Sequence, residues 1–212
     1  MNQQSEAALE KKQIEHIHRD DEGSKMGMWL FLFTEFLLFG GLFILYASYR
    51  YIYPYDFKIG AMTLDPILGG VNTIILLTSS LTVVLAILAL QRNQKTFSIY
   101  MLSFTVFCGL IFLVNKYFEW GAKIDHGIYP KGPGLEGFPN GEVVFIGLYY
   151  VMTGLHGLHV IAGIVFLSII LLFVVKDKIT GSNYQRFENA GLYWHLVDII
   201  WIFLFPLFYL IH

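Results

Sequence analysis

Five apolar stretches, separated by shorter polar segments, form the dominant pattern of this 212-residue chain. Each stretch is long enough, at about 1.5 Å of rise per residue, to cross the hydrocarbon core of a bilayer as an α-helix. The pattern therefore predicts an all-α integral membrane protein, a bundle of five transmembrane helices. The expected spans cover residues 25–49, 67–90, 97–118, 143–175 and 190–211.

The polar segments define the rest of the organisation. Residues 1–24 form a tail of mixed charge, expected to be a short surface helix or disordered, without the apolar core of a cleavable signal peptide. Residues 25–212 are expected to form one transmembrane domain. Segments 51–66 and 121–142 are predicted loops, and the second, rich in Gly and Pro, is expected to hold little regular structure.

Composition and charge narrow the function classes. Hydrophobic residues make up 56% of the chain and charged residues 14%, as expected for a membrane protein. No basic cluster accompanies the aromatic residues, so nucleic-acid binding has no support. The N-terminal tail and the second and fourth connections carry nine Lys and Arg, against five in the other two connections. The more basic side stays in the cytoplasm, which places the N-terminus inside and the C-terminus outside.

Two histidines lie within the fourth span, where polar side chains are costly and need a reason. At 100° per residue, His156 and His159 fall on one face of this helix. Gly154 and Gly157 lie on a neighbouring face, where another helix can come close. The i, i+3 pair could chelate a metal ion, but no third ligand is evident at that depth, and a structural role is favoured.

Other polar groups are expected at membrane depth. Measured from the inner ends of their spans, Glu35 and Asp198 lie about 14 and 12 Å deep, so they could share a network if the first and last helices touch. Glu35 is interpreted as a neutral, hydrogen-bonded acid or as a group with a role in function or assembly. His195 either pairs with Asp198 locally or reaches across helices. Glu119 lies at the outer boundary of the third span, where it could be solvated.

Two other function classes follow from these residues. A proton or ion transporter could use Glu35, His156, His159 and Asp198 as a relay, although the chain shows no internal repeat. A haem-binding membrane cytochrome is disfavoured because His159 and His195 differ by about 16 Å in depth, too far to hold one haem between them. An optical spectrum of the purified chain separates these classes, since a haem band would support the cytochrome.

Four ordered motifs resemble subunit III of the haem–copper respiratory oxidases, the cytochrome c oxidase and quinol oxidase group, in its shorter bacterial form. The resemblance covers all five spans. The most specific motifs lie in the fourth and fifth spans. The four motifs are GMWLFLFTEFLLFGGLF at 27–43, FEW at 118–120, TGLHGLHV at 153–160 and YWHLVDIIWIFL at 193–204.

The resemblance implies a non-catalytic subunit of an oxygen-reducing complex in the bacterial cytoplasmic (inner) membrane. Haem and copper would reside in partner subunits I and II, with no cofactor or metal in this chain. The subunit would pack against subunit I, support proton uptake and hold membrane phospholipid, with cytochrome c or quinol as the electron donor. Its intramembrane polar network would comprise Glu35, Glu119, His156, His159, His195 and Asp198.

This chain departs from the mitochondrial form of the family in two respects. That form has seven helices, with lipid in a cleft between the first two and the other five, whereas this chain begins where the third would. The mitochondrial form also has an arginine near the inner end of the histidine helix, where this chain has Phe173. Its lipid-binding residues therefore do not all carry over.

The charge bias predicts the orientation directly. In intact cells, a cysteine introduced at residue 10 should escape labelling by a membrane-impermeant thiol reagent, because the tail faces the cytoplasm. A cysteine introduced in the loop 121–142 should be labelled. Labelling at residue 10 without labelling in the loop would reverse the assignment.

Overall fold

The computed structural model describes the backbone of residues 3–211 and the side chains of residues 22–211, and this part of the chain is helical without a β-strand. Its helices are α1 (Gln3–Ile52), α2 (Pro54–Met62), α3 (Pro66–Gln91), α4 (Lys95–Asp125), η1 (Pro133–Leu135), α5 (Asn140–Val175) and α6 (Gln185–Tyr209). Within the described residues, five helices are long and apolar enough to cross a membrane. The predicted all-α architecture with five spans is confirmed.

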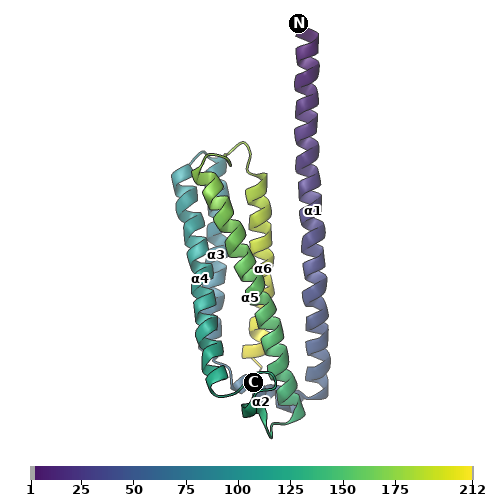
Figure 1. The fold of residues 1–212 in the computed structure, drawn as a ribbon, viewed down its shortest axis with the longest axis vertical. Helices are drawn as coiled ribbons and strands as arrows, with labels where there is room; N and C mark the ends of the chain where they lie inside the picture. The colour runs from purple at the N-terminus through teal and green to yellow at the C-terminus, as the bar shows by residue number, and fades with distance from the viewer. Residues whose placement is uncertain (1–2, 212) are drawn as a thin grey trace. The chain divides into compact units, whose positions relative to one another are not determined.

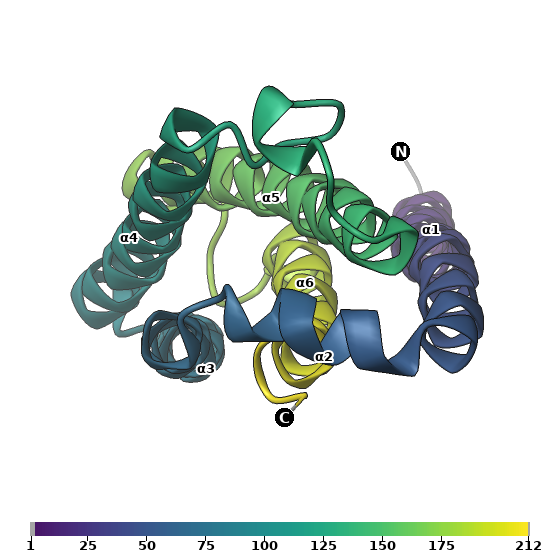
Figure 2. The same ribbon diagram turned by 90° about the horizontal axis from the view of Figure 1, so that it is seen from below.

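The chain divides into two compact units, Met1–Leu38 and Phe39–His212. In the second unit, α3 and α4 run antiparallel, side by side, with α5 and α6 packed against them (Figure 1). The short helix α2 lies across one end of this bundle, against α5 and α6 (Figure 2). The last part of α1 joins the same unit through Tyr46, whose hydroxyl donates to the Leu207 carbonyl and whose ring packs on Phe208.

Three segments contain more helix than the sequence pattern predicts. The segment 51–66, predicted to be a loop, contains α2, and the long loop 121–142 contains the end of α4, η1 and the start of α5. The described part of the N-terminal tail continues into the first span as one helix. Two helices, α2 and α3, begin with a proline. Pro54 and Pro66 lie in the first turn, where a backbone N–H has no partner within the helix, so its absence costs no hydrogen bond.

Local capping explains where α3 begins. Asp65 precedes Pro66 in extended conformation, and its Oδ1 accepts from the backbone N–H groups of Ile67 at 2.8 Å and Leu68 at 3.3 Å. These bonds satisfy two of the donors left free at a helix N-terminus. At the other end of the helix, Asn93 adopts φ 58°, a left-handed conformation that asparagine tolerates, and the chain turns into α4.

The centre of the bundle is built around Trp194 of α6, which is fully buried. Its indole N–H donates to Ser79 Oγ of α3 at 3.0 Å. The ring fits against Gly109 of α4 and Gly163 of α5, where an added Cβ would lie 2.8 Å and 2.7 Å from ring carbons. Two glycines on facing helices therefore leave the space that one large aromatic side chain fills.

Filling this space should destabilise the bundle. Gly163→Leu should lower the free energy of unfolding by about 1–3 kcal/mol or more, because overpacking forces neighbouring side chains to move. Gly147→Leu on the same helix is the matched control, since a Cβ there meets no atom within 4 Å. Thermal unfolding of the full chain in mild detergent measures both, and equal stability of the two variants would contradict the role of Trp194.

Candidate functional site

A buried ion pair with two tyrosines occupies the end of the bundle near the α4 C-terminus. Lys116 Nζ donates to Glu119 Oε2 at 2.9 Å and to the hydroxyls of Tyr149 and Tyr209 at 3.0 Å each. Both hydroxyls in turn donate to Glu119 Oε1, at 2.7 and 2.6 Å. These four residues, here called the Lys116 cluster, join α4, α5 and α6 in one closed set of hydrogen bonds.

The cluster is well suited to a low-dielectric environment. The three donors of the Lys116 ammonium are all used, and both oxygens of Glu119 accept. The ammonium also lies 4.9 Å from the ring centroid of Tyr149 and 5.5 Å from that of Trp201, so aromatic faces surround the charge. A buried ion pair is tolerated when its remaining hydrogen-bonding groups are satisfied in this way.

The cluster corrects one expectation and adds residues that the sequence did not single out. Glu119 is 8% exposed, so it is buried rather than solvated at a boundary. Lys116 precedes it by one helical turn, and this i, i+3 spacing was the available signal. Tyr149 and Tyr209 could not be paired with it from sequence, because they come from two other helices.

The two motif histidines have different surroundings. His156 is fully buried between the rings of Phe112, at 5.5 Å, and Trp201, at 5.2 Å, and neither ring nitrogen has a hydrogen-bond partner among the described residues. His159 is half-buried, and its Nδ1 bonds to the Leu155 carbonyl at 2.8 Å. The two imidazoles therefore have different neighbours, although they lie one turn apart on the same helix.

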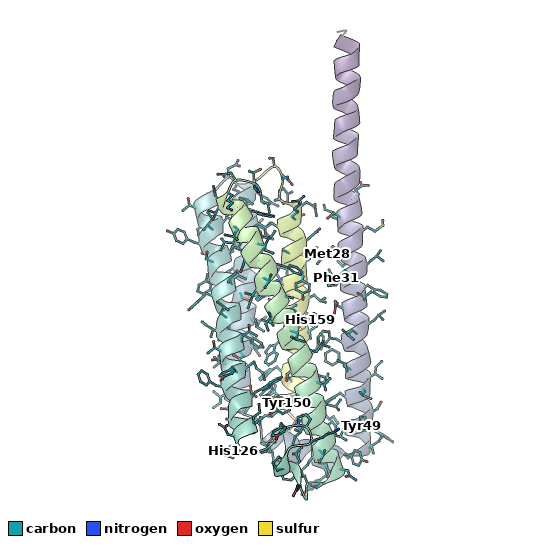
Figure 3. All side chains as sticks on the ribbon, viewed as in Figure 1. Met28, Phe31, Tyr49, His126, Tyr150 and His159 are labelled. Atoms are coloured by element: carbon teal, nitrogen blue, oxygen red, sulfur yellow. The ribbon has the colours of Figure 1, made fainter. Side chains whose placement is uncertain are left out.

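Aromatic contacts hold His159 in the middle of α5, where Figure 3 shows it. Its ring lies 5.3 Å from that of Phe39 and 6.4 Å from that of Tyr193. The Tyr193 hydroxyl also donates to the His159 carbonyl at 3.2 Å. His159 thus contributes to packing between the end of α1, α5 and α6.

His195 of α6 reaches across to a hydroxyl of α3, and Asp198 is buried one helical turn further along α6. Ser80 Oγ lies 2.6 Å from His195 Nδ1. Asp198 is 2% exposed, and its carboxyl oxygens make no hydrogen bond of acceptable geometry to any described residue. Of the two expectations for His195, the contact across helices is the one that the structure shows.

Glu35 lies on α1 in the unit Met1–Leu38. It has an interaction partner, so it is not an isolated acid. Its predicted network with Asp198, which belongs to the other unit, stays a prediction. Among residues 22–211, no three His, Cys, Asp or Glu side chains gather in a way that could hold a metal ion.

The ion pair of the Lys116 cluster gives a direct stability test. Lys116→Met should lower the free energy of unfolding by about 3–5 kcal/mol, because it leaves Glu119 buried without its counter-charge. Adding Glu119→Gln removes that charge while keeping an acceptor for the two tyrosines, and should restore part of the loss. Thermal unfolding of the full chain in detergent measures both variants. If Lys116→Met were as stable as the parent chain, the ion pair between Lys116 and Glu119 would contribute little to stability.

Comparison with known proteins identifies the family. The model of the family described as cytochrome c oxidase subunit III matches residues 4–212. A cytochrome c oxidase subunit 3 from Alkalihalophilus pseudofirmus is 33% identical over 87% of this chain and 85% of its own. A probable quinol oxidase subunit 3 from Staphylococcus haemolyticus is 29% identical, over 91% of this chain and 92% of its own.

A third relative joins two subunits in one polypeptide. A heme-copper oxidase subunit I+III from Aeropyrum pernix is 30% identical over 93% of this chain, and the match spans 24% of that longer protein. The family model and the names of the three relatives all refer to subunit III, and the five apolar helices fit a membrane subunit. The chain belongs to the cytochrome c oxidase subunit III family.

Proposed function

We propose that this chain is the accessory, cofactor-free subunit III of a haem–copper terminal oxidase in a bacterial cytoplasmic membrane. It packs against subunit I, stabilises it and supports its proton uptake, while haem and copper reside in subunits I and II. The observation that carries this proposal is the Aeropyrum pernix relative, whose name assigns one chain to both subunit I and subunit III. Two subunits joined in one polypeptide are readily explained if they act side by side.

The interior of the bundle supports a structural rather than a catalytic role. In the Lys116 cluster, the ammonium and the carboxylate bond to each other and to two tyrosines of the same chain. His156 is enclosed by aromatic rings and fully buried, so a substrate cannot reach it without a change in packing. These groups hold helices together, which is what a supporting subunit needs.

The proposal covers either electron donor. The relatives include proteins named as cytochrome c oxidase subunits and proteins named as quinol oxidase subunits, matched over similar shares of this chain. The donor would be bound by the partner subunits. The N-terminus is proposed to face the cytoplasm, as the charge bias predicts.

Glu35 tests the accessory role. Tagged and gently solubilised, the chain should co-purify with a large haem-bearing polypeptide. In that complex, Glu35→Ala should leave the initial oxygen consumption per haem near that of the parent, because electron transfer needs no group from this chain. The variant should lose activity sooner over successive turnovers or pump protons less well, because Glu35 is half-buried and its removal leaves its interaction partner unsatisfied.

Initial rate, inactivation half-life and subunit content are measured on the same preparation. Loss of initial turnover with subunits I and III still bound would mean that Glu35 is catalytic and the accessory role is wrong. Recovery of the tagged chain from its native membrane as a lone, monodisperse protein would contradict the proposed partnership. A haem absorption band in the separated chain would favour a membrane cytochrome instead.

A further inference from the structure

Five oxidisable aromatic residues form an unbroken chain of ring contacts through the end of the bundle that holds the Lys116 cluster. Ring centroids lie 4.9 Å apart between Trp120 and Tyr150, and 5.5 Å apart between Tyr150 and Tyr149. The contacts continue from Tyr149 to Tyr209 at 6.4 Å and from Tyr209 to Trp201 at 6.3 Å. Figure 3 shows Tyr150 on α5, toward this end of the bundle. Tryptophan and tyrosine are the aromatic side chains that give up one electron most readily, so these rings connect electron donors of α4, α5 and α6.

One end of this series of rings is accessible. Trp120 is half-buried and lines an apolar groove of about 1070 Å³ between α4 and α5. Tyr149, Tyr209 and Trp201 are each at most 2% exposed. Both helices that border the groove are long and apolar enough to cross a membrane. A molecule dissolved in the bilayer therefore reaches Trp120 before it reaches the buried rings.

The hydrogen bonds decide where the loss of an electron is stabilised. An oxidised tyrosine is strongly acidic and gives up its phenolic proton to a base within hydrogen-bond reach, about 2.6–3.2 Å. The hydroxyls of Tyr149 and Tyr209 both donate to Glu119 Oε1, at 2.7 and 2.6 Å. By contrast, the Tyr150 hydroxyl donates to a backbone carbonyl, and the Trp120 indole N–H has no hydrogen-bond partner among residues 22–211. A base is therefore available at Tyr149 and Tyr209 and not at the two residues nearer the groove.

Trp201, at the far end of the series, also lacks a base. Its indole N–H donates to the hydroxyl of Thr73, at 3.0 Å, which does not accept a proton readily. The two buried tyrosines are therefore the end point for the missing electron.

The cluster can also hold the charge that remains. Transfer of a proton to Glu119 neutralises the carboxylate and leaves one positive charge on Lys116. The Lys116 ammonium lies 4.9, 5.5 and 5.7 Å from the ring centroids of Tyr149, Trp201 and Tyr209. Aromatic faces stabilise a cation at such distances, so the ammonium keeps favourable neighbours after the carboxylate is protonated.

We propose that these rings intercept peroxyl radicals, the one-electron oxidants that form in lipid, and hold the oxidising equivalent as a neutral tyrosyl radical at Tyr149 or Tyr209. The peroxyl radical takes one electron from Trp120 and one proton from solvent, and becomes a hydroperoxide. Trp120 regains an electron from the buried tyrosine through Tyr150, and the phenolic proton of that tyrosine passes to Glu119. One O–H bond forms in the hydroperoxide and one breaks in the tyrosine. This activity depends on insertion of the chain in a membrane and not on its proposed role in an oxidase.

Electron paramagnetic resonance of the full chain in mild detergent tests the proposal. Peroxyl radicals are generated by photolysis of a lipid-soluble azo compound in the presence of oxygen, at wavelengths that the protein does not absorb, and the samples are frozen at once. The parent chain should give a tyrosyl signal, identified by its narrowing when tyrosine is deuterated on the ring. Tyr149→Phe combined with Tyr209→Phe should abolish this signal. Trp120→Phe should lower it, whereas Tyr100→Phe, at an exposed tyrosine of α4 outside the series, should leave it unchanged.

Lys116→Met combined with Glu119→Gln tests the base without leaving a lone buried charge. An amide cannot take up the phenolic proton, so the tyrosyl signal should be lost in this variant. Thermal unfolding checks that it is folded at the temperature of photolysis, and Trp120→Phe, which keeps a ring in place, decides the case if it is not.

Three results would overturn the proposal or a step of it. A parent chain without a tyrosyl signal, or an unchanged signal after both tyrosines are replaced, would overturn the site. An unchanged signal in Trp120→Phe would overturn the route from the groove. A full signal in the folded variant without Glu119 would overturn the role of this carboxylate. Because the chain is studied alone, none of these results bears on its role in an oxidase.

Discussion

The ion pair between Lys116 and Glu119 determines how one end of the bundle can be assembled. Two opposite charges on adjacent turns of α4 are buried where lipid surrounds the protein, and each needs further hydrogen bonds to be tolerated there. Tyr149 and Tyr209 supply them from α5 and α6. Because the cluster closes only when all three helices are in register, it specifies their relative heights as well as stabilising them.

Elsewhere in the bundle, single hydrogen bonds between uncharged side chains join the helices. Between α3 and α4, Thr82 and Thr105 share a hydrogen bond of 2.8 Å, and Asn115 donates to Asn72 at 2.8 Å. Trp194 reaches Ser79 between two glycines. Helices in a membrane gain little from the hydrophobic effect among themselves, so small residues and interhelical hydrogen bonds carry their association. The polar positions of this chain are therefore largely devoted to holding helices together.

This arrangement suits a subunit that supports a partner. Most polar groups of the interior are bonded within the chain, and the apolar exterior is left for lipid and for neighbouring subunits. Among the departures from this pattern, the Asp198 carboxyl and the His156 ring nitrogens have no hydrogen-bond partner among the described residues, and a groove lies between α4 and α5. The first two are unsatisfied groups inside the bundle, and the groove is space that this chain leaves unfilled.

The sequence by itself determined the five apolar spans, their helical form and the family, because each rests on local composition or on contiguous motifs such as TGLHGLHV at 153–160. It also singled out several polar residues within the spans, although it did not single out Lys116. It could not assign partners among them, since partners come from helices whose rotation about their axes is set by packing. Helical spacing placed His156 and His159 on one face, yet aromatic neighbours on other helices separate their environments. Likewise, Glu119 was a boundary residue in sequence and became buried only because Tyr149 and Tyr209 close over it in the folded bundle.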